Sequence, residues 1–345
     1  MIEAHTTDAW TRAADKQTIA FRNATILGGF AAPLFLFLAG VALVLAATRR
    51  AERTGRRADG VEAICKRGLE IFVLAFLFRA QALIVSPGGP LVSFFRVDIL
   101  NVMGPAIVLA GLVWGLAATT SARVAAYAAI AAAIGLLTPI VRGAPWVASL
   151  PIWLQWYLRP AGEYTTFTML PWAGFVFAGG AVGALLAAAR DVTAERRVNA
   201  ALACAGASLI AVGFVTASRP TIYHASAYHS PLFWTSSPTW FAIRVGIMMV
   251  ALAGIYALAA LAERRGLVLR PLMLIGQHSL FVYWIHVELV YGYASRWWQH
   301  RLPLWGTAAA CAAFSILMYG AVRLKRSRTW RLPFVEKPAP GYRVA

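Results

Sequence analysis

The sequence contains a series of apolar runs, each long enough to cross a lipid bilayer as a helix. A bilayer core of about 30 Å requires roughly 20 helical residues. The runs are rich in Ala, Leu, Val, Gly and Phe, and they lack the strict alternation of a membrane β-barrel. We therefore predict an all-α fold, a polytopic transmembrane helix bundle. Its nine predicted spans are residues 25–47, 69–87, 99–119, 123–142, 168–189, 198–217, 241–262, 267–293 and 302–324.

The low share of charged residues supports this prediction. Hydrophobic residues make up 60% of the chain and charged residues only 13%. A soluble domain carries roughly 25% charged residues. A chain with half that share cannot cover a water-facing surface, so the lipid bilayer is its expected partner.

The net charge of +18 does not indicate nucleic-acid binding, because the basic residues follow every second predicted span. The alternate loops are much poorer in Lys and Arg. This positive-inside pattern places the basic loops and the C-terminal tail in the cytoplasm, and a bacterial inner membrane is the expected location. The basic residues that cluster after these spans are Arg49, Arg50, Arg53, Arg56, Arg57, Lys66, Arg67, Arg190, Arg196, Arg197, Arg264, Arg265, Arg270, Arg323, Lys325, Arg326, Arg328 and Arg331.

The cysteines predict neither a disulfide framework nor a metal site. Cys65 falls in a cytoplasmic loop, and Cys204 and Cys311 fall inside spans. Disulfides require an oxidising compartment, and no pair of cysteines lies in a non-cytoplasmic loop. No metal-ligand spacing such as CxxC or HExxH occurs, so we expect no metal.

The predicted topology divides the chain into a non-cytoplasmic segment, 1–24, a transmembrane domain, 25–324, and a cytoplasmic basic tail, 325–345. Segment 1–24 is polar and lacks the apolar region of a signal peptide. It is either a short tail translocated unaided or the end of a lost first helix, in a chain whose start was assigned to an internal Met. The second interpretation is preferred because of a resemblance to a known family.

Four stretches carry this resemblance: MIEAHTTDAW at 1–10, GFAAPLFLFLAG at 29–40, LPWAG at 170–174 and GQHSLFVYWIH at 276–286. In this order they resemble the end of the first helix, the second helix, the mid-chain Pro-Trp helix start and the late Gly-x-x-Ser-Leu…Tyr…His helix of heparan-alpha-glucosaminide N-acetyltransferase-like proteins. These proteins are relatives of the acyltransferase 3 membrane enzymes. The Arg-Gly pair that usually opens the first helix of the family is missing here.

The resemblance implies a membrane-bound acyl-CoA-dependent O- or N-acyltransferase. An acetyl or other acyl group would pass from cytoplasmic acyl-CoA to a carbohydrate-like acceptor reached from the other side. The alternative is a small-molecule or lipid-linked-sugar transporter, although the repeats with broken helices that are typical of transporters are not evident. A non-catalytic scaffold and a homo-oligomer also remain open.

Histidines are the candidate catalytic residues, because imidazole can act as a base or nucleophile near neutral pH. His5 occupies the position of the family's histidine, and Asp8, one helical turn on, would orient its ring. The alternative is an exposed histidine in a polar tail. His286, with Glu288 nearby, forms a second candidate pair, whose alternative is a solvated helix end.

Arg79 is the deepest charge of span 69–87, and Asp98 begins the next span. A charge inside a membrane span is costly and tends to pair or to face a cavity. We predict an Arg79–Asp98 ion pair facing the bundle interior, which a separation above about 6 Å would contradict. Asn101, one turn after Asp98, would contact the acceptor together with this pair.

Arg50 and Arg53 form an Arg-x-x-Arg spacing in the first cytoplasmic loop, as some acyltransferase 3 members have. Guanidinium groups suit the phosphates of coenzyme A, so both are candidate contacts of the donor, acetyl-CoA or another acyl-CoA. Topology alone also explains arginines at this position.

Overall fold

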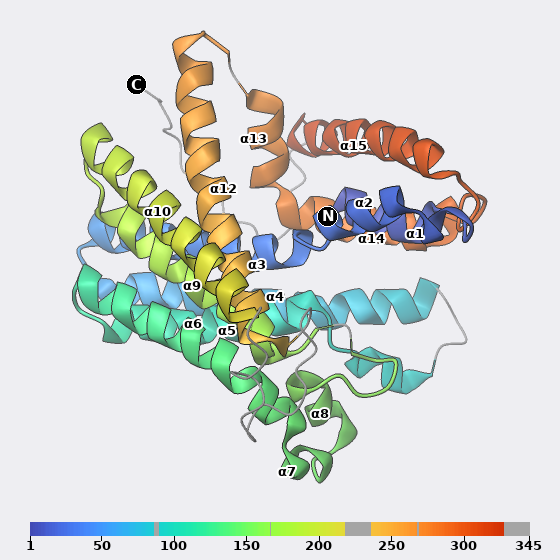
Figure 1. Cartoon of the computed structure of the whole chain (residues 1–345), viewed down its shortest axis with the longest axis horizontal. Helices are drawn as coiled ribbons and strands as arrows, with labels where there is room; N and C mark the ends of the chain where they lie inside the picture. The colour runs from blue at the N-terminus through green and yellow to red at the C-terminus, as the bar shows by residue number, and fades with distance from the viewer. Residues whose placement is uncertain (86–89, 166, 218–235, 268, 328–345) are drawn as a thin grey trace. The chain divides into compact units, whose positions relative to one another are not determined.

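The structure of the chain, a computed structural model, describes residues 1–85, 90–165, 167–217, 236–267 and 269–327 (Figure 1). Within these ranges the chain is all-helical and contains no β-strand, which confirms the predicted fold class. Most of the predicted tail 325–345 lies outside the described residues.

Seven helical segments among the described residues are long and apolar enough to cross a membrane. The protein is therefore an integral membrane protein, as predicted. The segments are Ile19–Thr54, which contains α2 (Ile19–Gly28) and α3 (Ala31–Thr54), α5 (Ile99–Leu116), α6 (Thr120–Gly143), α9 (Met169–Ala188), α10 (Val192–Ala217), α12 (Pro238–Arg264) and α15 (Leu304–Ser327).

The number of nine spans is not confirmed. Predicted span 69–87 falls in α4 (Arg57–Val85), and its last two residues lie outside the described part of the chain. Predicted span 267–293 is not one helix but two, α13 (Arg270–Gln277) and α14 (Ser279–Tyr291). The break is at His278, whose φ of −111° and ψ of 25° depart from helical values.

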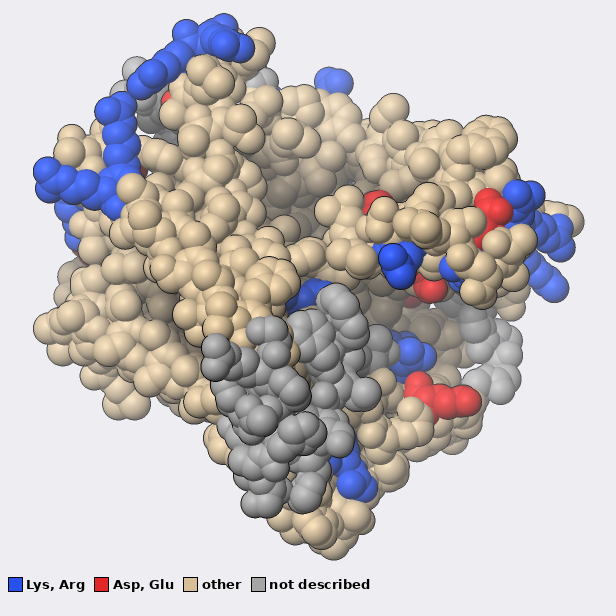
Figure 2. All heavy atoms as spheres, in the orientation of Figure 1, with Lys and Arg blue, Asp and Glu red and all other residues tan. Residues whose placement is uncertain are grey.

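The chain divides into two compact units. Residues 29–266 form the larger unit, in which α3 packs against α9, α4 against α5, and α6 against α9. Helix α10 packs against α12. Of the short helices, η2 (Leu91–Phe95) packs against α4, and α8 (Ile152–Leu158) packs against α9 and against α7 (Pro145–Ala148). In Figure 2, Lys and Arg side chains gather at the N-terminal end of α10 and the C-terminal end of α12.

Glycines allow the close contact between α3 and α9. A Cβ atom at Gly40 would meet the backbone of α9, and one at Gly179 would meet the backbone of Phe37 in α3. Small residues let membrane helices approach until their backbones touch, which replaces the hydrophobic driving force that lipid does not provide.

Residues 1–28 and 267–345 form the smaller unit. It contains α1 (Ile2–Trp10), η1 (Asp15–Gln17), α2, α13, α14, η4 (Tyr293–Ser295) and α15. Its core includes Trp10 of α1, Val290 of α14, and Phe314 and Met318 of α15. Segment 1–10 is therefore helical and packed, rather than an exposed polar tail.

Candidate functional site

Helices α1 and α14 pack together and bring His5, Asp8, His286 and Tyr291 into one cluster, all within the smaller unit. His5 and Asp8 lie one turn apart on α1, and His286 and Tyr291 lie on α14. The cluster combines both predicted histidines with the predicted carboxylate.

The hydroxyl of Tyr291 connects Asp8 to His5. It donates a hydrogen bond to Asp8 Oδ2 at 2.9 Å, and it lies 3.2 Å from His5 Nδ1. Lys16 Nζ donates to the backbone oxygen of Asp8 at 2.7 Å and lies 3.9 Å from its Oδ1. The predicted influence of Asp8 on the His5 ring therefore passes through a tyrosine.

The donor and acceptor roles follow from the number of protons. A phenolic hydroxyl has one proton, and a carboxylate can only accept. Because Tyr291 gives its proton to Asp8, its oxygen must accept from Nδ1–H of His5. In the neutral ring this leaves the Nε2 lone pair of His5 available to take a proton from a substrate or to attack a carbonyl carbon.

His286 is fully buried beside His5, and the two ring centroids are 5.1 Å apart. Its Nδ1 lies 2.7 Å from the carbonyl oxygen of Val282, so Nδ1 is the donor. Tyr283 packs edge-on against the same ring at 5.7 Å. This position supports the His5 ring, and a direct catalytic role for His286 stays a prediction.

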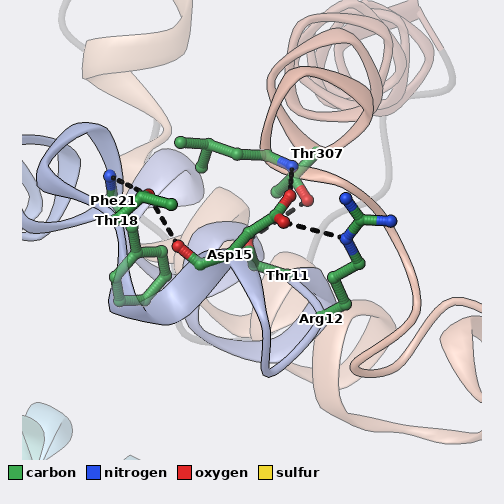
Figure 3. Close-up of polar contacts among 7 residues, drawn as sticks. Thr11, Arg12, Asp15, Thr18, Phe21 and Thr307 are labelled. Carbon is green, nitrogen blue, oxygen red and sulfur yellow. Dashed lines mark hydrogen bonds and ion pairs between the residues drawn. The ribbon is translucent and has the colours of Figure 1, made fainter.

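The end of α1 is anchored to the start of α15 (Figure 3). The carboxylate of Asp15 accepts hydrogen bonds from the backbone N–H of Leu304 at 2.7 Å and from Arg12 Nε at 2.9 Å. The Leu304 bond, with Arg12 in addition, holds the pKa of Asp15 below its ordinary value of 3.8. The Thr11 and Thr307 hydroxyls also bond at 3.2 Å, so two polar contacts hold α1 in register with α15.

The predicted Arg79–Asp98 ion pair is present in the larger unit, and both side chains are largely buried, at 17% and 15% exposure. Arg96 Nε lies 3.8 Å from the same carboxylate. Asp98 also caps α5, and Asn101 completes the capping box by accepting from the Asp98 backbone N–H at 3.1 Å. Asn101 is fully buried, and the roles of these residues in acceptor binding stay predictions.

Arg50 and Arg53 lie in the last turns of α3. Neither lines the 270 Å³ cavity at this end of the larger unit, which is lined instead by Arg57, Arg123 and Arg190 among others. A role for Arg50 and Arg53 in binding the donor stays a prediction.

Sequence reasoning missed Tyr291 and Lys16. Tyr291 stands five residues after His286 in an apolar helix, where a tyrosine is as typical of a membrane interface as of a site. Lys16 follows Asp8 by eight residues, beyond the end of α1, so no helical spacing relates the two. Only the packing of α1 against α14 and the turn after α1 identify them.

Comparison with known proteins gives one family match. Residues 1–214, more than half of the chain, match the model of the family described as heparan-alpha-glucosaminide N-acetyltransferase, catalytic. His5, Asp8, Arg79 and Asp98 lie inside the matched range, whereas His286 and Tyr291 lie beyond it. A search of curated proteins gives no match.

Proposed function

Because the chain belongs to the heparan-alpha-glucosaminide N-acetyltransferase catalytic family, we propose that it transfers an acetyl group from acetyl-CoA to a carbohydrate-like acceptor across the membrane. The family match supports an acetyltransferase-like function in a membrane protein. Acetyl-CoA as the donor and a carbohydrate as the acceptor are what we propose in addition. The observation that carries the proposal is the Asp8–Tyr291–His5 chain within the smaller unit.

We assign His5 the role of general base. Its Nε2 takes the proton of an acceptor hydroxyl or amine while the acceptor oxygen or nitrogen bonds to the acyl carbon. The C–S bond of the thioester breaks, and the departing thiolate recovers the proton from His5. Alternatively, Nε2 bonds to the acyl carbon first and the acceptor then displaces it, and both routes give the same products.

Tyr291 and Asp8 hold the His5 ring in the required tautomer. The Tyr291 oxygen keeps the proton of His5 on Nδ1, and the Asp8 carboxylate stabilises the charge that develops on the ring during proton transfer. A carboxylate plays the same two roles toward histidine in a catalytic triad, although there it touches the ring directly.

The transporter alternative is not favoured, since the family match indicates acyl transfer. The geometry of the cluster fits an amine acceptor and a hydroxyl acceptor equally, because imidazole can deprotonate either group.

Transfer of radiolabelled acetyl groups in membranes containing the chain would test the proposal. Glucosamine and N-acetylglucosamine would serve as acceptors, since the first offers an amine and hydroxyls and the second only hydroxyls. We expect label in at least one sugar and its loss in His5→Ala. The control is His278→Ala, because His278 contacts Leu274 and lies outside the cluster. Transfer that survives His5→Ala would overturn the catalytic role of His5, and absence of any acetyl-CoA turnover would overturn the proposed activity.

A further inference from the structure

The larger unit contains a cavity of about 270 Å³ where the ends of α3, α4, α5, α6 and α9 meet. Arg57, Arg123 and Arg190 line it, together with the single carboxylate of Glu52. The Glu52 carboxylate is already engaged, because Arg190 Nη2 bonds to its Oε1 at 2.5 Å. Two of the arginines are therefore left without a carboxylate at the cavity.

Arg57 and Arg123 are held close together by the last carbonyls of α5. Arg57 Nη2 donates to the oxygens of Gly115 and Ala117, each at 2.8 Å, and Arg123 Nε donates to the same Ala117 oxygen at 3.1 Å. Neither guanidinium makes an ion pair within the described residues. Two like charges that share one carbonyl repel each other, and an anion between them would remove that repulsion.

Each guanidinium group has further N–H donors besides those that bond to the carbonyls. Arg57 contacts the carbonyls through Nη2 and Arg123 through Nε, so the other nitrogens of each fork remain available. Arg123 also lies over the ring of Trp114, at 4.2 Å from the ring centroid. This stacking fixes the direction of its fork before any ligand binds.

Trp114 and Thr48 also line the cavity. Trp114 is 1% exposed, and its Nε1, like Thr48 Oγ1, is buried without a hydrogen-bond partner among the described residues. Because these two atoms have almost no accessible surface, the donors that a ligand in the cavity can reach are those of the arginines.

We propose that this cavity binds a phosphate ester, with Arg57 and Arg123 as its charged contacts. The oxygens of a phosphate group accept bidentate bonds from a guanidinium fork. The identity of the ester rests on the proposed function, under which the ester is coenzyme A. An anionic lipid headgroup has the same chemistry.

Binding to the purified chain in phosphatidylcholine nanodiscs tests the site without requiring turnover. Calorimetric titration would compare coenzyme A, 3′-dephospho-coenzyme A and pantetheine, which has no phosphate. We expect Arg57→Gln and Arg123→Gln each to weaken coenzyme A binding by about tenfold or more, as for a lost charged hydrogen bond. Pantetheine binding should be unchanged by either substitution.

A matched variant controls for folding. Arg56→Gln is this control, since Arg56 adjoins Arg57 but pairs with Asp59 and does not line the cavity. Arg57→Gln tests the site even where Arg123→Gln fails to fold after losing its contact with Trp114.

A lipid arm separates the two sources of phosphate. Thermal unfolding would be measured in phosphatidylglycerol and in phosphatidylcholine nanodiscs. A gain in stability from phosphatidylglycerol that Arg57→Gln removes and Arg56→Gln keeps would support the site and assign it to a headgroup. Insensitivity of both coenzyme A binding and the lipid effect to Arg57→Gln and Arg123→Gln would overturn the site.

The site and the proposed function fail separately. Arg57-dependent binding of coenzyme A without acetyl transfer would leave the site standing and overturn the proposed function. His5-dependent transfer with binding that ignores Arg57 and Arg123 would do the reverse.

Discussion

The Tyr291 hydroxyl donates to Asp8 Oδ2 at 2.9 Å, although the two residues are 283 positions apart in the sequence. The same oxygen contacts His5 Nδ1 at 3.2 Å. Tyr291 therefore determines which nitrogen of His5 carries the proton, and the properties of the site depend on a residue outside the matched range 1–214.

Tyr291→Phe tests this dependence. The variant keeps the ring and its packing but removes the oxygen that accepts from His5. We expect kcat for acetyl transfer to fall by about tenfold or more, which is at least about 1.4 kcal/mol of activation free energy. KM for acetyl-CoA should change little, since Tyr291 is not one of the residues that line the cavity proposed to bind the donor. Tyr293→Phe, on an exposed tyrosine of η4, is the control, and an equal loss in both variants would contradict the assignment.

The Arg79–Asp98 pair should show strong coupling in a double-mutant cycle. Each single variant, Arg79→Met or Asp98→Asn, breaks a largely buried ion pair by removing one of its two charges, so each should be more destabilising than the double variant. Thermal unfolding in detergent would measure the coupling, which we expect to exceed about 1 kcal/mol. The more exposed Arg67–Glu70 pair is the control, with a coupling below about 1 kcal/mol. Equal coupling in the two pairs would show that burial of Arg79 and Asp98 adds nothing.

Gly179→Ala should separate α3 from α9. The new methyl group would meet the backbone of Phe37, which cannot move aside as a side chain can. We expect a loss of about 1–3 kcal/mol of stability, the usual cost of overpacking, seen as a lower melting temperature in detergent. Gly254→Ala in α12 is the control, because a methyl group at that position would meet no atom within 4 Å. A stable Gly179→Ala variant would mean that the two helices do not touch at this glycine.

Asp15→Asn should lower stability at neutral pH and lose that effect in acid. The folded pKa of Asp15 is depressed, so its contribution is complete above the unfolded pKa and disappears as pH falls through the folded pKa. The difference in melting temperature between the parent chain and Asp15→Asn should therefore shrink as pH falls below about 3.8.

Melting curves between pH 7 and pH 3 would measure this difference. Asp59→Asn is the control, since Asp59 pairs with Arg56 in the larger unit and leaves the Leu304 contact intact. A difference that grows toward acid pH would contradict the role of the carboxylate in holding α15.

Much of the helical organisation was predictable because it depends on local properties. The lengths and composition of the apolar runs predicted helices that include α5, α6, α9 and α10. The prediction of one span over 267–293 is not confirmed, because hydropathy averaged over a window does not detect a backbone break at a single residue, His278. The Arg79–Asp98 pair was predictable for a different reason, since a charge inside a span strongly favours the nearest available partner.

By itself the sequence determined that this protein is a helical membrane protein, and its motifs indicated the family and predicted a catalytic role for His5. These properties are set by residues close together in the chain, through helix length, hydropathy and spacing. Only the tertiary structure decided that Tyr291 joins Asp8 to His5 and that Arg57, Arg123 and Trp114 line one cavity. Hydrogen bonds act over about 3 Å, so their partners depend on which helix faces pack together, and no local pattern in the sequence specifies that.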